Sequence, residues 1–492
     1  MATPLSQGTL GQIDQRIARP SYDRGKVTPG ILHVGLGNFH RAHQAIYLDD
    51  LVGKEGASGW GILGAGVMPG DAAMRGDLEG QDWLYSVSEQ DADGDAVRVV
   101  GVMTGFLPVE TGHGAIIKAL DDPSIRILSL TVTEGGYFMD PSKGGFDAEH
   151  PSILADIANP DAPTTVFGAI VAGLRARRAA GAKPFTVMCC DNLPHNGAVT
   201  RRVVMGVAEG QDKDLAKWIA DTVTFPNGMV DRITPATSPE RRAGLARDYG
   251  LDDTRPVFCE PFRQWVLEDN FCDGRPDLDS VGVQFVPDVA PFENMKIRML
   301  NGGHAVIAYP AGLMDVEYVH EAMEHPLVAA FLEKVEREEI VPMVPPVPDT
   351  SLDDYLTLIR GRFGNPRIGD TVRRLCLDGS NRQPKFIVPS IIDNRKAGKS
   401  VPGLALESAL WCRYCAGTTD SGAAIAPNDP SWDRLTELAK AAKSEPSKWL
   451  AMGDVYGDLG QDTGFADAFA GWLGKLWKDG TAATLRDYLG RS

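Results

Sequence analysis

A strand, a glycine turn and a helix follow one another without a break near the start of the chain. Ile31–Val34 is a short, mostly apolar run, Gly35–His43 reads Gly-Leu-Gly-Asn-Phe-His-Arg-Ala-His, and an apolar-periodic helix is expected through Leu51. In such a unit the glycines let the backbone approach a pyrophosphate, and the helix N-terminus offers amide donors. This end of the chain is therefore predicted to form a nucleotide-binding α/β fold.

The residues expected to contact a dinucleotide are those of the turn. They are Gly35, Leu36, Gly37, Asn38, Phe39 and His40. His40 stands where the third glycine of a GxGxxG fingerprint would be, so we expect looser packing of the helix on the strand there. A tight turn that binds nothing is the alternative interpretation at this point.

An acidic residue follows the second expected strand, Trp60–Val67. A carboxylate at that place accepts hydrogen bonds from the adenosine ribose and disfavours a 2′-phosphate. Asp71 is the nearest candidate, which predicts NAD rather than NADP as cofactor. Arg75 is close in sequence, so a solvated loop carboxylate is the other interpretation of Asp71.

Polar residues also follow later strands, where ligands bind in parallel sheets. Thr133 and Glu134 are expected on the nicotinamide side of the cofactor, and Asn192 and Asp231 are candidates for contact with substrate, although turn residues have the same composition. The expected strands are Leu84–Ser88, Val97–Val102, Ile125–Val132 and Phe185–Cys190. Between the last two, a helix is expected over Pro163–Ala182, with Arg177 on its solvated face.

Alternating strands and helices continue to about residue 285, and helical patterns dominate afterwards. The fold class predicted is α/β, with a Rossmann-like, mostly parallel sheet domain at 1–285 followed by a mostly α-helical substrate domain at 286–492. An apolar, proline-rich stretch, Val341–Pro348, is expected to be an extended connection on the surface of the second domain.

The first helix of the second domain carries Lys296-Ile297-Arg298-Met299-Leu300-Asn301-Gly302-Gly303-His304. On an α-helix, at about 100° per residue, Asn301 lies about 140° and His304 about 80° round from Lys296, so the three polar tips share one side. Adjacent glycines cost a helix about 1 kcal/mol each, which suggests a close approach to the backbone there. Taken alone, the three side chains are more often ordinary hydrogen-bonded or surface groups.

A second group of basic side chains follows, at Arg374, Arg382 and Lys385. In an acidic protein this group is suited to bind hydroxyls or a carboxylate, or else it pairs with nearby acids and has no further role.

The composition restricts partners and location. A net charge of −17 argues against nucleic acid or an anionic membrane as a partner. No long apolar run or signal peptide is evident, so a cytoplasmic protein is expected. The seven cysteines include one CxxC, Cys412 and Cys415, but no second CxxC or HExxH accompanies it, so we predict reduced thiols and no metal.

Four ordered motifs give the chain its closest resemblance. The Gly35–His43 turn, Thr133–Tyr137, Cys190–Pro194 and Lys296–His304 are similar to those of the polyol-specific long-chain dehydrogenase family over roughly Ile31 to Pro389. The resemblance implies NAD-dependent oxidation of a secondary hydroxyl, D-mannitol to D-fructose and the reverse, without metal. It also implies a small polyol or ketose as the only partner of a monomer or weak homo-oligomer.

The same resemblance assigns roles to residues. Lys296 would be the general base, Asn192 and Asn301 would hold the substrate oxygen, and His304 would orient the substrate. Glu293 and Arg374 match a glutamate and an arginine that the family uses. A neutral lysine accepts the hydroxyl proton only if its pKa lies well below ~10.4, which burial and a positive neighbour such as Arg298 would favour.

Four alternatives stay open or fail at this point. The hexuronate and hexonate oxidoreductases of the same family share these motifs. A non-catalytic nucleotide-sensing protein, or a Rossmann-type methyltransferase, would have a similar glycine turn. A short-chain dehydrogenase needs Tyr-x-x-x-Lys on a later helix, but the only match, Tyr22 to Lys26, precedes the first strand.

Overall fold

The computed structural model describes residues 2–54, 56–140 and 145–490. The chain forms two compact units, Met1–Ala290 and Pro291–Ser492. The domain boundary predicted from the sequence lies just before this division, between residues 285 and 286.

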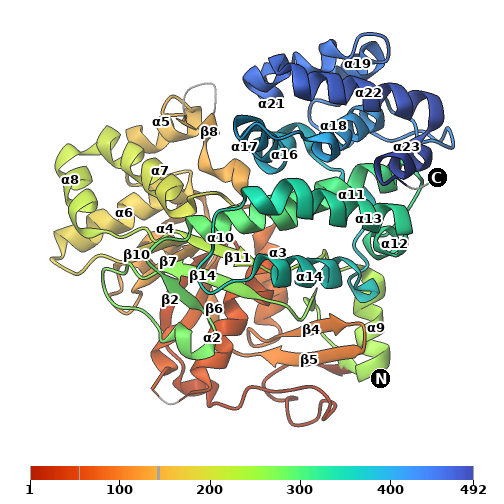
Figure 1. The fold of residues 1–492 in the computed structure, drawn as a ribbon. Coiled ribbons are helices and arrows are strands. Elements are labelled where there is room, and N and C mark those ends of the chain that lie inside the picture. The colour runs from red at the N-terminus through yellow and green to blue at the C-terminus, as the bar shows by residue number, and fades with distance from the viewer. Residues whose placement is uncertain (1, 55, 141–144, 491–492) are drawn as a thin grey trace. The chain divides into compact units, whose positions relative to one another are not determined.

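A five-stranded parallel sheet forms the centre of the first unit (Figure 1). Its spatial order is β6-β3-β2-β7-β10, and every neighbouring pair is parallel. The strands are β2 (Pro29–Val34), β3 (Gly61–Ala65), β6 (Met103–Phe106), β7 (Ile127–Leu130) and β10 (Thr186–Cys189). In chain order this is 3-2-1-4-5, the order of a dinucleotide-binding half-sheet, and the predicted fold class is confirmed.

Successive side chains of these strands point to opposite faces, and each face is covered by helices. Ile31 and Ile127 pack with helices α1 (Asn38–Ala42) and α2 (Gln44–Val52) on one face. On the other face, Leu32, Leu128 and their neighbours pack on a second helical layer. That layer contains α4 (Gly114–Asp121), α6 (Val166–Ala179), α7 (Asn196–Gln211) and α8 (Lys213–Thr222).

The runs Leu84–Ser88 and Val97–Val102 form strands, as predicted, but outside the parallel sheet. Here β4 (Tyr85–Asp91) and β5 (Gly94–Val100) form an antiparallel hairpin that is extended by β13 (Val257–Cys259). One prediction for this unit is wrong. Arg177 is fully buried, not solvated, and donates to the carbonyls of Leu120, Asp122, Ile125 and Lys183.

A third sheet brings the Asp231 segment into the unit. It contains β11 (Gly228–Asp231), β14 (Gln264–Glu268) and β15 (Gln284–Val286). The remaining strands and α-helices described are β1 (Thr3–Pro4), α3 (Asp71–Glu79), β8 (Met139–Asp140), β9 (Gly145–Phe146), α5 (Pro151–Ala158), α9 (Pro239–Tyr249) and β12 (Leu251–Asp252).

The second unit is helical in its described residues, as predicted. Helix α10 (Ala290–Met295) continues into a π-helix, η7 (Lys296–Asn301), and then into α11 (Gly302–Leu313). Helices α18 (Pro402–Cys415) and α22 (Thr463–Asp479) lie side by side (Figure 1). The other α-helices are α12 (Val319–Glu324), α13 (Pro326–Val335), α14 (Leu352–Phe363), α15 (Val372–Leu375), α16 (Gly379–Phe386), α17 (Val388–Lys396), α19 (Trp432–Ala442), α20 (Ser447–Leu450), α21 (Gly453–Tyr456) and α23 (Thr481–Tyr488).

The stretch Val341–Pro348 lies at the surface as predicted, with its four prolines exposed, but it is not extended throughout. It begins as a 3₁₀-helix, η9 (Val341–Met343), directly after a second π-helix, η8 (Glu336–Ile340). Val344 and Val347 are buried, because apolar side chains in a short connection find a place in the core. Among the described helices, none is long and apolar enough to cross a membrane.

Candidate functional site

The strand order places a crevice between the carboxyl ends of β2 and β7, because the chain leaves these neighbours in opposite directions across the sheet. Gly35 follows β2 directly and has a φ of 96°, a conformation that favours glycine. A Cβ at Gly35 would lie 2.0 Å from the carbonyl oxygen of Thr131, which follows β7. Only glycine therefore allows the two strand ends to approach this closely.

Gly37 lies on the open side of the same turn. It is exposed and precedes α1, and a Cβ built there would have no neighbour closer than the Gly35 carbonyl oxygen, at 4.0 Å. Leu36, between the glycines, is buried. The chain's own packing therefore does not require glycine at position 37, whereas a ligand lying on the backbone would.

Asn38 is engaged by its own chain at the start of α1. Its Oδ1 accepts from Arg41 at 2.7 Å, and its Nδ2 donates to Thr237 Oγ1 at 3.3 Å. A cavity of about 500 Å³ opens beside it, with Met74 of α3 and Arg242 of α9 in its walls.

His40 corrects one expectation. The ring is 1% exposed and stacks on His33 of β2, with 3.3 Å between ring centroids, so the helix packs tightly on the strand without a third glycine. Burial lowers the pKa of His33 to about 3 and that of His40 well below its usual value, so both rings are neutral. Phe39, next to it, stacks on His43.

Asp71 is the first residue of α3, after the loop that follows β3. Its Oδ2 accepts the backbone N–H groups of Val67 and Met68, both at 2.9 Å. Its other oxygen has no such bond among the residues that the structure describes. The carboxylate is thus held at the end of the second strand of the sheet, where an acidic group is expected to meet a ribose.

The other candidates of the first unit also lie at strand ends. Thr133 follows β7 with φ of 71° and ψ of 158°, a strained conformation for a β-branched residue. Glu134 begins a 3₁₀-helix, and its side chain lies outside the described residues. Asn192 is exposed in the loop after β10, and Asp231 is buried at the end of β11.

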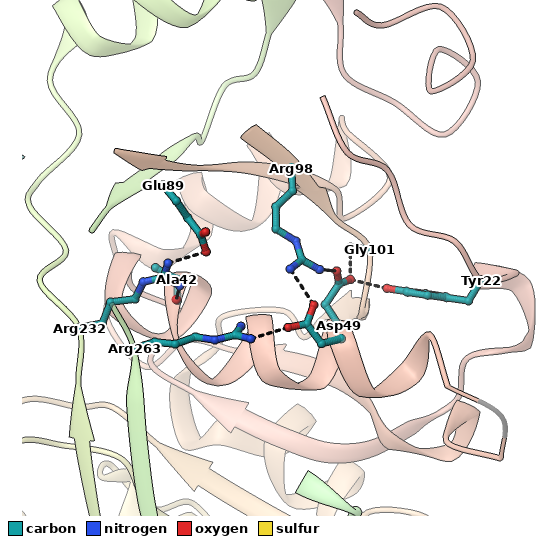
Figure 2. Close-up of polar contacts among 9 residues, drawn as sticks. Tyr22, Ala42, Asp49, Glu89, Arg98, Gly101, Arg232 and Arg263 are labelled. Carbon is teal, nitrogen blue, oxygen red and sulfur yellow. Dashed lines mark hydrogen bonds and ion pairs between the residues drawn. The ribbon is translucent and has the colours of Figure 1, made fainter. Parts of the chain in front are cut away.

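A buried arginine connects the Asp231 segment to the glycine-turn helix (Figure 2). The Arg232 side chain is fully buried and donates to the Ala42 carbonyl at 2.6 Å and to Glu89 at 2.5 Å. Nearby, Asp49 and Asp50 of α2 bind Arg98 of β5. The same network includes Tyr22 and Gly101 on Asp49, and Arg263 on Asp50 (Figure 2). Together these contacts fix α1 and α2 against two of the smaller sheets.

In the second unit, Lys296 and Asn301 are the first and last residues of π-helix η7. The prediction of a regular α-helix here is wrong. A π turn holds more residues than an α turn, so residues five apart lie closer together round the axis than the 140° expected for an α-helix. Lys296 is 7% exposed, and such π turns occur often at functional sites.

His304 lies one turn further along, in α11. Its ring stacks on Phe363 with 4.0 Å between centroids, and among the described residues no group bonds to its buried Nε2. Burial, and then the positive charges of Arg374, Arg362, Arg382 and Lys296, hold its pKa well below the usual value. His304 is therefore a neutral imidazole close to several cations.

The side chains of the basic group, Arg374, Arg382 and Lys385, have different surroundings. Arg374 makes a double ion pair with Asp370, so it pairs with a nearby acid, which was the second interpretation of this group. Arg382 donates to the Leu375 carbonyl at 3.2 Å. Lys385 is exposed. Helix α15, which carries Arg374, nevertheless packs on α11, and α16, which carries Arg382, packs on the π-helix η7.

Glu293 is buried one turn before Lys296, in α10. Arg298, expected as a positive neighbour of Lys296, pairs with Asp393 at 2.6 Å and donates to the Met343 carbonyl. Its charge is therefore largely offset by the carboxylate of Asp393.

Sequence reasoning missed Glu336, a fully buried acid in the second π-helix. Its Oε1 would lie 2.9 Å from a Cβ at Gly303, and burial raises its pKa well above the usual value. The adjacent glycines were the available signal, because they implied that something lies close to the backbone. They did not say which group it is.

The seven cysteines form no disulfide, and Cys412 and Cys415 are buried. Within residues 2–54, 56–140 and 145–490, no three His, Cys, Asp or Glu side chains are placed to hold a metal ion. Independence from metal stays a prediction that requires a chelation experiment.

Comparison with known proteins places the whole chain. The family model of the mannitol dehydrogenase Rossmann domain matches residues 29–280, and that of the mannitol dehydrogenase C-terminal domain matches residues 288–477. The chain belongs to the mannitol dehydrogenase family. The predicted resemblance to polyol-specific dehydrogenases is confirmed, and the chain is an enzyme of that class.

Individual members of the mannitol dehydrogenase family agree over full length. Mannitol 2-dehydrogenase of Cereibacter sphaeroides is 62% identical over 96% of this chain and 99% of its own. The structure of Pseudomonas fluorescens mannitol 2-dehydrogenase with NAD and D-mannitol is 41% identical, with a TM-score of 0.89 over 100% of both chains. A substrate-free D-sorbitol dehydrogenase is 36% identical, with a TM-score of 0.90 over 98% of this chain and 100% of its own.

Proposed function

We propose that this member of the mannitol dehydrogenase family oxidises D-mannitol at C2 to D-fructose with NAD, and catalyses the reverse reduction. The observation that carries the proposal is full-length similarity to an enzyme whose structure holds both NAD and D-mannitol. The 62% identity to a second mannitol 2-dehydrogenase supports the same substrate.

The residues of the first unit fit a dinucleotide. The crevice between β2 and β7 is bounded by Gly35, and the exposed Gly37 leaves the backbone open to a pyrophosphate. Asp71 suits the adenosine ribose and repels a 2′-phosphate, which favours NAD over NADP. When bound, NAD accepts the hydride that leaves the substrate carbon.

The chain's own residues would handle the proton and the developing charge. Lys296 takes the proton of the C2 hydroxyl once it has lost its own proton and is a neutral amine. Asn192 and Asn301 donate amide hydrogen bonds to the oxygen as negative charge grows on it. His304, a neutral imidazole with a buried Nε2, is suited to bind a second substrate hydroxyl.

The remaining assignments are supporting roles. Glu293, buried next to Lys296 in sequence, would receive the proton from the amine. Asp231, Arg374, Arg382 and Lys385 would bind the outer hydroxyls of the polyol. Of these, Arg374 is the least available to bind substrate, since its guanidinium group already donates two hydrogen bonds to the Asp370 carboxylate.

D-Sorbitol is the second candidate substrate. It is the C2 epimer of D-mannitol and gives the same ketose on oxidation at C2, and one full-length structural relative is a D-sorbitol dehydrogenase. The hexonates and hexuronates of the sugar-acid branch are a third class, for which the relatives described above give no support.

The test is NADH formation by the purified protein, with the cofactor and substrate varied separately. We expect the highest kcat/KM with NAD and D-mannitol, unchanged after exhaustive chelation. A higher kcat/KM with D-sorbitol or a hexonate would make that compound, and not D-mannitol, the preferred substrate. Tight NADH binding without turnover of any of them would favour a nucleotide sensor.

A further inference from the structure

One buried carboxylate joins the loops that leave β7 and β10. Asp191 Oδ2 accepts the Val132 N–H at 2.9 Å and its Oδ1 accepts the Thr133 N–H at 3.0 Å. The Tyr137 hydroxyl donates to Oδ2 at 2.5 Å. Since Leu130 and Cys189 are paired in parallel strands, both loops leave the same edge of the sheet. Three donors of the Thr133 loop thus converge on a single side chain that is 8% exposed.

The segment held in this way is strained. Thr133 has φ of 71°, which a β-branched residue adopts only when its surroundings enforce it. Its N–H is bonded to Asp191, and Tyr137, four residues later, is fully buried. Hydrogen bonds to an ionised carboxylate are the stronger kind, so this carboxylate is suited to hold the loop in its unfavourable conformation.

A second buried side chain extends the connection to the strand that carries Asp231. Asn196 Nδ2 donates to the Asp191 carbonyl at 3.1 Å and to the Gly228 carbonyl at 2.7 Å. The Gly228 N–H returns a bond to Asn196 Oδ1 at 2.9 Å. The ends of β7, β10 and β11 are therefore tied together through Asp191 and Asn196.

We propose that Asp191 is a positioning residue of the cofactor site, which fixes the Thr133 backbone against the nicotinamide end of the bound dinucleotide. The inference rests on the proposed function, because it takes the crevice between β2 and β7 as the dinucleotide site. Asp191 also directly precedes Asn192 in the chain. Its hydrogen bonds therefore help to fix the backbone position from which the Asn192 side chain extends.

The test is Asp191→Asn, which keeps the shape of the side chain but leaves one acceptor oxygen and turns an NH₂ toward an N–H donor. Affinity for NADH should fall by about tenfold or more, whereas affinity for ADP-ribose, which lacks nicotinamide, should stay within about threefold of the parent. kcat with D-mannitol should fall by about 10²-fold, the cost of a misplacement near 1 Å. A residue with only a structural role would not separate the two ligands.

Asp156→Asn is the matched control. Asp156 is a fully buried aspartate of the same unit, and it accepts the backbone N–H and the hydroxyl of both Thr164 and Thr165. Its loss should lower the melting temperature but leave the ratio of NADH to ADP-ribose affinity unchanged. Tyr137→Phe removes one of the three donors, so its ratio of NADH to ADP-ribose affinity should lie between those of the parent and Asp191→Asn. This variant tests the proposal if Asp191→Asn does not fold.

The outcomes separate the two proposals. A parent protein that binds NADH and turns over polyol, with an unchanged affinity ratio and kcat in Asp191→Asn, would overturn the role of Asp191 alone. The same holds for Tyr137→Phe if only that variant folds. A parent that binds neither NADH nor ADP-ribose would overturn the proposed function and this inference with it.

Discussion

Asp71 is the residue on which the preference between NAD and NADP is expected to depend. We expect Asp71→Asn to reduce the ratio of kcat/KM for NAD over NADP by at least about tenfold, or ~1.4 kcal/mol, because the repulsion of a 2′-phosphate is lost. The asparagine oxygen can still accept from Val67 and Met68, so the loop should keep its shape. Kinetics with the two cofactors measure the ratio.

Glu79→Gln is the control for this prediction, because it removes the same charge from the same helix, α3, where Glu79 pairs with Arg75. It should change the ratio by less than about twofold. If the Asp71 variant behaves like the Glu79 variant, another group selects the cofactor.

Several single residues show where the sequence was not informative enough. The pattern of the glycine turn identified His40 as a departure from the fingerprint, but its partner, His33, stacks on it only because β2 and α1 pack together. Arg177 has the composition of a surface residue, yet four carbonyl groups at the ends of neighbouring segments receive its donors. Such contacts arise from tertiary structure and leave no local pattern.

At the scale of elements, the contact between Gly303 and Glu336 predicts an unusual response to alanine. Gly303→Ala would place its Cβ 2.9 Å from Glu336 Oε1, and the fully buried acid has no solvent to move into. We expect a loss of about 1–3 kcal/mol in the free energy of unfolding, as for other overpacked cores. Urea denaturation measures it.

Gly361→Ala is the matched control, because no atom lies within 4 Å of a Cβ built there in helix α14. It should stabilise the protein by about 0.4–1 kcal/mol, the usual gain of alanine over glycine at an unstrained site. Equal effects at the two positions would mean that Glu336 yields readily.

The elements themselves were largely predictable, and their arrangement was less so. Apolar runs bounded by glycine located four strands of the parallel sheet, and the loss of strand patterns after residue 285 indicated the helical unit. Strand pairing depends on partners distant in sequence, so β4 and β5 could not be assigned to a separate sheet. A π turn differs from an α turn by one inserted residue, and the composition of Lys296–Asn301 does not distinguish the two.

Over the whole molecule, buried acids predict a decrease in stability with rising pH. Burial raises the pKa of Glu339 to about 7 and that of Glu407 to about 8. Between about pH 4.5 and these values the folded protein holds protons that the unfolded chain has lost, so the free energy of unfolding falls as pH rises. In the Glu407→Gln variant, the free energy of unfolding should fall less steeply than in the parent, by about 1.4 kcal/mol per pH unit between about pH 6.5 and 7.5.

Chemical denaturation at a series of pH values measures this slope, with Glu437→Gln, an exposed site, as control. Below about pH 6.5 the buried neutral histidines act in the opposite direction, since burial lowers the pKa of His33 and His43 to about 3. The comparison is therefore confined to higher pH. Identical slopes for the parent and Glu407→Gln would show that Glu407 is ionised in the folded protein.

The measurement that tests the central claim most directly is the turnover of Lys296→Ala with NAD and D-mannitol, made beside its NADH affinity. If Lys296 is the base, kcat should fall by about 10²–10⁴-fold, while the glycine turn, in the other unit, binds NADH as before. The parent kcat should rise with pH through one ionisation that the variant lacks, and an added primary amine should restore part of the rate. A kcat within about threefold of the parent, or roughly 0.6 kcal/mol, would contradict the assignment of Lys296 as the catalytic base.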